Sequence, residues 1–157
     1  MDKVEELLER VDVISRIINE TKHLLYKPVY INTKFSLDET FNLNVTEKLK
    51  LPVLDVNNGI TFDEVYPAEV NSVELGIYPY AITFDIYCHR FYKYSLKRET
   101  TVARVAEFLL FLRENREAVF KAIDELIERL KKNLNKVKEL YEEVKKVKAL
   151  LEIVGGD

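Results

Sequence analysis

The longest stretch of the chain without a helix breaker lies at its C-terminal end. Between Ile77 and Val154 there is no glycine, and Pro79 is the only proline. Glycine and proline are the residues that most strongly interrupt helices, so the sequence after about residue 100 favours long helices. All four prolines and eight of the nine tyrosines lie between Tyr26 and Tyr94, a composition typical of strands and turns. These patterns predict a central sheet with helices at both ends.

Apolar residues recur every three or four positions in three segments, which is the spacing of one helix face. The first predicted helix covers about residues 2–25 and ends before Pro28. The second, at about 101–114, is apolar on several sides, so we expect it to lie buried on the sheet. A break is expected at residues 114–116, and a long amphipathic helix at about 117–154 follows.

Alternating apolar and polar residues between about 28 and 96 predict an antiparallel sheet of about six strands. Residues 29–37 form one expected strand, followed by a turn at Asp38-Glu39. The final strand is expected to begin at about Ile82 and to run toward Ser95 without a break.

The segment LDVNNGITFDEV contains the strongest turn signal of the chain, an Asn-Gly pair between alternating residues. A three-residue loop that ends at Gly59 keeps the apolar side chains on one face of the hairpin. It pairs Val56 with Ile60 and Leu54 with Phe62. Gly59 is then expected in the left-handed conformation, which a residue without a Cβ adopts at little cost.

The length of 157 residues suits one α+β domain, residues 1–157, that folds without a metal or a disulfide. A hydrophobic fraction of 47% and a charged fraction of 32% are typical of a soluble protein, and a single cysteine excludes a disulfide framework within the chain. The acidic start is unlike a signal peptide, and no apolar run approaches the roughly 20 residues of a membrane span, so we expect a cytoplasmic protein without membrane association. The many lysines and glutamates resemble the surfaces of thermophile proteins.

Cys88 and His89 stand side by side and raise the question of a catalytic pair. If both lie on the expected final strand, their side chains point to opposite faces, so the imidazole cannot activate the thiol. Cys88 continues the apolar register of Ile82, Phe84 and Ile86. We therefore interpret it as a small buried apolar residue.

Four carboxylates lie on the expected sheet: Asp63, Glu64, Glu74 and Asp85. Oxygen ligands of this kind hold Mg²⁺ in metal-dependent hydrolases, where at least three must converge on one point. The alternative is a solvated sheet face whose charges discourage pairing between sheet edges. Because no spacing is diagnostic, the solvated face is favoured and no metal ligand is assigned.

Basic and aromatic residues alternate directly after this acidic region. They are Arg90, Tyr92, Lys93, Tyr94, Lys97 and Arg98. On one exposed face, such residues can stack on bases and neutralise phosphates, although a formal net charge of −3 gives no global attraction to nucleic acid. The alternative is a strand end whose tyrosines cover a helix while the lysines stay in water.

The long C-terminal helix carries an apolar stripe that exceeds the diameter of a small domain, since about 38 helical residues span roughly 57 Å. The expected self-association stripe consists of Leu134, Val137, Leu140, Val144, Val147 and Leu151. An apolar stripe in water needs a partner. The N-terminal helix and a second subunit both remain open as that partner.

Several familiar catalytic and binding motifs are absent, namely a glycine-rich phosphate loop, GxSxG, HExxH and an EF-hand loop. Two histidines and one cysteine also disfavour a transition-metal site. No catalytic, cofactor-binding or metal-binding residue is assigned, and no cofactor is expected. The leading hypothesis is a non-enzymatic interaction or scaffold protein that forms homo-oligomers through its helices. Nucleic-acid binding through residues 89–98 is the second hypothesis, and metal-dependent hydrolysis is the third.

Overall fold

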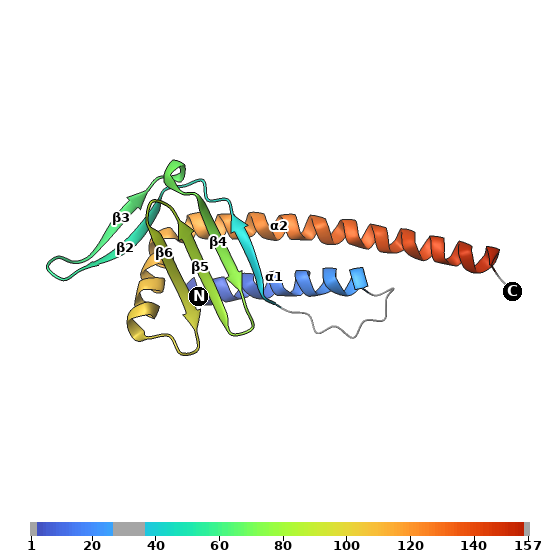
Figure 1. Ribbon diagram of the computed structural model, residues 1–157, viewed down its shortest axis with the longest axis horizontal. Coiled ribbons are helices and arrows are strands. Elements are labelled where there is room, and N and C mark those ends of the chain that lie inside the picture. Colours follow the sequence, from blue (N-terminus) through green and yellow to red (C-terminus); the bar gives the residue numbers. More distant parts are fainter. Residues whose placement is uncertain (1–2, 27–36, 156–157) are drawn as a thin grey trace. The chain divides into compact units, whose positions relative to one another are not determined.

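The structure, a computed structural model, describes residues 3–26 and 37–155 (Figure 1). Within these residues two α-helices, six strands and a short 3₁₀ helix follow one another. They are α1 (Lys3–Tyr26), β1 (Glu39–Leu43), β2 (Leu49–Asp55), β3 (Gly59–Val65), η1 (Pro67–Glu69), β4 (Ser72–Ile77), β5 (Ala81–Tyr87), β6 (Phe91–Lys97) and α2 (Val102–Val154). This order confirms the predicted α+β class, with a helix on either side of a region of antiparallel strands.

The described residues divide into two compact units. The first contains residues 3–11 and 37–126, and therefore all of the described strands. The second contains residues 12–26 and 127–155, which are the later parts of the two helices. Both α1 and α2 pass from one unit into the other, so the division into units does not decide whether the chain is one domain. The predicted single domain therefore stays a prediction.

The described strands form two antiparallel sheets. One has four strands in the order β1-β4-β5-β6, and the other is the β2-β3 hairpin. The predicted number of strands is confirmed, but the prediction of a single sheet is wrong. Glu39, expected in a turn, begins β1 and pairs with Ile77 of β4. The predicted strand at 29–37 lies outside the described residues, apart from Leu37.

The β2-β3 hairpin turns at the Asn-Gly pair as predicted, and Gly59 has a φ of 77°. The register differs, because Leu54 pairs with Ile60 and Asp55 pairs with Gly59. The three-residue loop therefore begins one residue earlier than predicted. An Asp55 carboxylate oxygen accepts a 2.9 Å hydrogen bond from the backbone N–H of Asn57, which fastens the loop and is the main reason that the pKa of Asp55 is lowered.

The predicted unbroken strand toward Ser95 is wrong. β5 ends at Tyr87, residues 88–90 form a turn, and β6 returns antiparallel to β5. Cys88 lies half-buried in this turn, where its Sγ donates a 2.8 Å hydrogen bond to the carbonyl of Arg90. Its interpretation as a buried strand residue is therefore also wrong. The turn contains no glycine, proline, asparagine or aspartate, so the alternating pattern did not reveal it.

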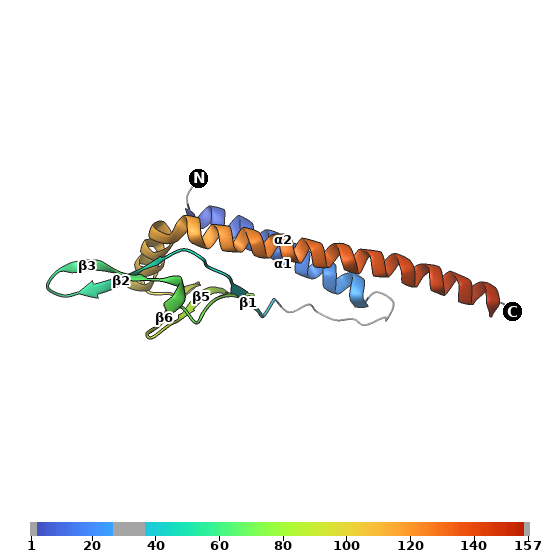
Figure 2. The same ribbon diagram turned by 90° about the horizontal axis from the view of Figure 1, so that it is seen from above.

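The inner face of the four-stranded sheet forms the core of the first unit. Phe84 of β5 is fully buried, as are Phe108 and Phe111 of α2. The ring of Phe84 lies 6.0 Å from that of Phe108 and 6.1 Å from that of Phe111, distances typical of packed aromatic pairs. Figures 1 and 2 place the helical segments of this unit on one face of the sheet. Residues of the alternate register therefore point to the opposite, outer face.

A kink at Asn115 interrupts α2, where φ is −118° and ψ is 18°, and this confirms the predicted break. Asn115 is 3% exposed, and its side chain bonds to three backbone groups. Its Oδ1 accepts from the N–H of Lys50 at 2.7 Å, and its Nδ2 donates to the carbonyls of Lys50 and Phe111 at 2.7 and 2.8 Å. The asparagine therefore ties the kink to the backbone of β2.

The part of α2 before the kink buries one face rather than several. Phe108, Phe111 and Leu112 are fully buried, whereas Val102 and Leu109 are 87% and 42% exposed. The expected deep burial of this helix is therefore not confirmed.

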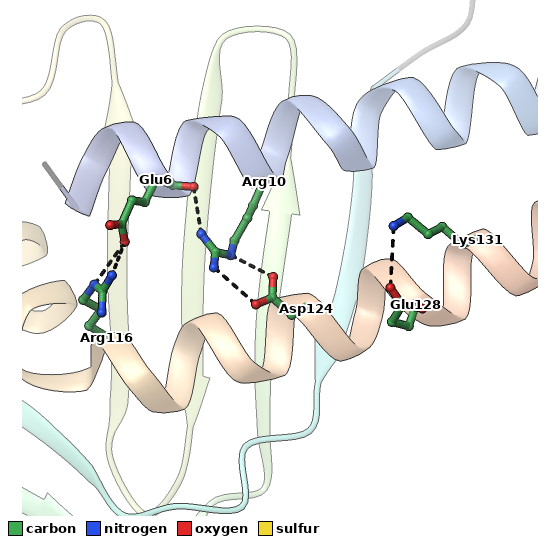
Figure 3. Close-up of polar contacts among 6 residues, drawn as sticks. All are labelled: Glu6, Arg10, Arg116, Asp124, Glu128 and Lys131. Atoms are coloured by element: carbon green, nitrogen blue, oxygen red, sulfur yellow. Dashed lines mark hydrogen bonds and ion pairs between the residues drawn. The ribbon is translucent and has the colours of Figure 1, made fainter. Parts of the chain in front are cut away.

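Polar contacts hold α1 against α2 in the first unit (Figure 3). Arg116 donates to Glu6 at 2.6 and 3.0 Å, and Arg10 donates to both carboxylate oxygens of Asp124 at 2.8 and 3.2 Å. Both guanidinium groups also lie near the ring of Phe120, at 4.3 Å for Arg10 and 5.4 Å for Arg116. Glu6 contacts Arg116, and Arg10, one turn further along α1, contacts Asp124, further along α2. The two helices therefore run parallel in this unit.

In the second unit both helices contribute buried apolar side chains. These are Ile14, Ile17, Ile18, Ile127 and Leu134. An ion pair at 3.2 Å joins Glu20 of α1 to Lys138 of α2. The two helices therefore lie side by side in this unit as well.

Candidate functional site

The last turns of α2 expose a row of apolar side chains, which we call the tail stripe. It consists of Leu140, Val144, Val147, Leu151 and Val154, which are 56, 48, 55, 65 and 83% exposed. Their alternating spacings of four and three residues place them on one helix face. Leu150 and Ile153, 60% and 77% exposed, add to the apolar surface beside it.

The predicted self-association stripe divides into two parts. Leu134 is buried and Val137 is half-buried, whereas the four residues from Leu140 onward are exposed. Glu20 pairs with Lys138, and α1 has six further residues, so α1 ends level with about residue 144 of α2. Packing on α1 therefore accounts for the start of the predicted stripe but not for its end.

Charges flank the tail stripe in a definite pattern. If Val144 and Leu151 occupy a positions of a heptad, Val147 occupies d, Glu143 occupies g and Lys148 occupies e. In a parallel pair of helices, a g residue lies beside the following e residue of the partner helix. Residues of opposite charge thus flank the tail stripe at the positions that would meet in a parallel pair.

The six residues of the predicted nucleic-acid patch do not share one exposed face. Tyr94 is 4% exposed, and its ring stacks on that of Phe111 at 4.5 Å with an interplanar angle of 9°. This burial raises the pKa of the Tyr94 phenol. Tyr92 is half-buried, whereas Lys93 and Lys97 are exposed on the outer face of β6. Tyr94 therefore belongs to the core, and nucleic-acid binding itself stays a prediction.

The two arginines of the predicted patch flank β6. Arg90 lies in the turn before it and donates to Asp63 of β3 at 2.8 Å and to the Tyr92 hydroxyl at 3.4 Å. The bond to Tyr92 contributes most to the raised pKa of Arg90. Arg98 follows β6 and is exposed. Arg90 therefore links the two sheets and is engaged by protein groups.

An exposed aromatic pair escaped the sequence analysis. Tyr87 and Phe91 flank the turn between β5 and β6, pair across the hairpin, and are 38% and 58% exposed. Their ring centroids are 5.1 Å apart. Partial burial, followed by the charge of Glu74, raises the pKa of Tyr87. The pair could have been found only by recognising the turn, since an unbroken strand holds these residues far apart.

A cleft opens between the outer side of β6 and the start of α2, and we call it the β6 cleft. Its volume is about 530 Å³, and it is lined by Lys93, Ser95, Lys97, Glu99, Thr100, Thr101 and Arg104. The lining therefore contains three cationic side chains, three hydroxyl groups and one carboxylate. Lys93 and Lys97 were singled out from the sequence, whereas the other lining residues were not. Arg104 and the two threonines lie beyond the end of the strand, and Ser95 lies on it between the two lysines.

The four predicted carboxylates fall in two pairs on two different sheets. Asp63 and Glu64 of β3 each form an ion pair with a basic side chain, at 2.8 and 3.0 Å. Glu74 and Asp85 face each other across β4 and β5 of the other sheet. In the described part of the chain, no group of three histidine, cysteine, aspartate or glutamate side chains could hold a metal ion. The convergence that the hydrolase hypothesis requires is not found there.

The chain matches no protein-family model, and neither a curated protein nor a solved structure is significantly similar to it. Of the helices in residues 3–26 and 37–155, none combines the length and the apolar character needed to cross a membrane.

Proposed function

We propose that this chain is an interaction or scaffold protein that self-associates through residues 140–154 of α2, with a second copy of the chain as the partner. The observation that carries the proposal is the tail stripe, five apolar side chains at heptad spacing that are 48 to 83% exposed. Exposed apolar surface of this extent and regularity is typical of association sites.

Charge complementarity favours a second copy in parallel orientation. Glu143 at g would lie beside Lys148 at e of the other copy, and two-fold symmetry would form this pair twice. Val144 at a and Leu140 at d also match the preference of two-stranded parallel coils. Val147 and Val154 at d and Leu151 at a depart from that preference, so the orientation is argued from the charges.

The interface is tested by placing a charge inside it and the same charge outside it. In Val147→Glu the carboxylate would lie in the core of the helix pair. The matched control is Ala149→Glu, two residues away at the outward f position of the same exposed helix. Burial of an unpaired charge costs several kcal/mol, so we expect Val147→Glu to weaken association at least about a hundredfold. Light scattering that gave both variants the mass of the wild-type assembly would refute the proposal.

Orientation is tested with a cysteine away from the centre of the stripe. The native Cys88 is first replaced by serine, and Leu151→Cys is then introduced. At this position a core residue meets its own copy when the helices are parallel and in register, whereas an antiparallel pair centred on Val147 would separate the two cysteines, so the expected product of the parallel pair is a disulfide-linked dimer under mild oxidation. The control Ala149→Cys should cross-link much more slowly. Equal rates for the two variants would contradict the parallel arrangement.

A further inference from the structure

We propose that the β6 cleft binds a phosphate group. This inference does not depend on self-association, because all lining residues belong to the first unit and the tail stripe belongs to the second. The cleft offers the two kinds of group that recognise phosphate, cationic side chains and hydroxyl donors.

The residues that line the β6 cleft carry a net positive charge. Lys93, Lys97 and Arg104 supply three positive charges, and Glu99 supplies one negative charge. Two further carboxylates lie close by. Asp85 pairs across the strands with Lys93, and Glu107 accepts a 3.2 Å hydrogen bond from Arg104. Arg104 is 67% exposed, and an exposed ion pair of this kind is weak, so its guanidinium can turn to a ligand.

The hydroxyls of the β6 cleft are set up as donors. The Thr100 hydroxyl oxygen accepts a 3.0 Å hydrogen bond from the backbone N–H of Lys97. The Thr101 hydroxyl oxygen accepts a 3.4 Å hydrogen bond from the backbone N–H of Arg104. A hydroxyl whose oxygen accepts in this way still has its proton to donate. Both threonines can therefore donate to phosphate oxygens while they fix the turn between β6 and α2.

The phosphate has two possible sources, a small phosphorylated ligand and the backbone of a single-stranded nucleic acid. The two sources differ in what else they would touch. Phe91 lies on the same outer face of β6 as Lys93 and Lys97 and forms the exposed pair with Tyr87. A nucleic acid that placed a phosphate in the cleft could stack a base on this pair, whereas a small phosphate would not reach it.

The experiment is an NMR titration of the full chain with sodium pyrophosphate, compared with sodium chloride at equal ionic strength. We expect saturable shifts of backbone amides between residues 93 and 104. The combined variant Lys97→Gln with Arg104→Gln should weaken binding at least about tenfold, since charge-assisted hydrogen bonds dominate phosphate recognition. The matched control is Lys121→Gln, which removes an exposed cation elsewhere in the same unit. Unchanged resonances outside residues 93–104 would show that the variants fold.

A second titration uses a short single-stranded oligonucleotide. Binding that shifts the same amides and is weakened by Phe91→Ala would assign the phosphate to a nucleic acid. Binding of pyrophosphate alone, unaffected by Phe91→Ala, would assign it to a small ligand. The proposal is overturned if neither compound gives saturable shifts in the cleft, or if Lys121→Gln weakens binding as much as the cleft variant does.

Discussion

Asn115 is the residue on which the kink of α2 depends, and its replacement by alanine gives the sharpest prediction about stability. The side chain is 3% exposed and makes three hydrogen bonds to backbone groups, two of them to Lys50 of β2. Each such bond contributes about 1 kcal/mol net, and backbone groups left without partners add to the loss. We expect Asn115→Ala to lower the free energy of unfolding by about 3 kcal/mol, or to lower Tm by roughly 6–12 °C for a chain of this size.

The assay is urea unfolding followed by circular dichroism, with Asn133→Ala as the matched control. Asn133 is exposed on the same helix, so its replacement by a better helix former should leave stability unchanged or slightly higher. A loss below about 1 kcal/mol in Asn115→Ala would refute the reasoning, because such a loss is the effect of an ordinary surface change.

Asn115→Asp tests the same contacts through pH. The carboxylate keeps an acceptor for Lys50 N–H but faces the carbonyls of Lys50 and Phe111 without a proton to donate. Its protonated form would be favoured in the folded state, which raises the pKa of the new carboxyl on folding. The destabilisation relative to wild type should therefore be largest near neutral pH and should shrink as pH falls through that raised pKa. A destabilisation that grew on acidification would contradict this account.

Three further predictions concern the first unit. A Cβ at Gly76 would clash with the Thr83 hydroxyl, so Gly76→Ala should cost about 1–3 kcal/mol in urea unfolding. A neutral effect would show that β4 and β5 accommodate the added methyl group. Burial raises the pKa of Tyr94, so the contribution of this shift to stability is present below the unfolded pKa of about 10 and is lost as pH rises further. Ultraviolet titrations of wild type and Tyr94→Phe should therefore differ only once the protein unfolds. A phenolate signal from Tyr94 in the folded protein near pH 10 would contradict its burial. A double-mutant cycle on Glu6 and Arg116 should give a coupling of about 0.5–1 kcal/mol that falls with added salt, and a coupling insensitive to salt would indicate a different interaction.

The helices could be predicted closely because their signal is local. Apolar spacing predicted α1 at 2–25, and the helix occupies Lys3–Tyr26. The polar residues at 114–116 predicted the break that the backbone of Asn115 shows. Both features depend on side chains within one or two helical turns, which a single sequence displays directly.

The sheets were less predictable because strand pairing is not local. Period-two alternation shows which residues share a face but not which strands are neighbours, so it could not separate the β2-β3 hairpin from the other four strands. The Cys-His-Arg turn lacks the usual turn residues, and the Asp55 side chain shifts the neighbouring loop by one residue. Missing the Cys-His-Arg turn placed Cys88 on a strand and hid the aromatic pair.

In the candidate sites too, features with a local sequence signal were predicted, and features that depend on non-local packing were not. The exposed end of the tail stripe follows from helical periodicity, and its residues from Leu140 onward were predicted. Lys93 and Lys97 were predicted on one strand, but the approach of Arg104 and two threonines depends on how the chain turns after β6. Tyr94 was assigned to the wrong surface, because alternation alone does not reveal which face of a strand meets a helix.

The central claim is that the tail stripe is an interface between copies of this chain. Sedimentation equilibrium of the wild-type protein over a wide range of concentrations tests it most directly. The account predicts a concentration-dependent rise from the chain mass of 18.5 kDa to twice that value, and loss of this rise in Val147→Glu but not in Ala149→Glu. A wild-type protein that keeps the mass of one chain at every concentration would contradict it.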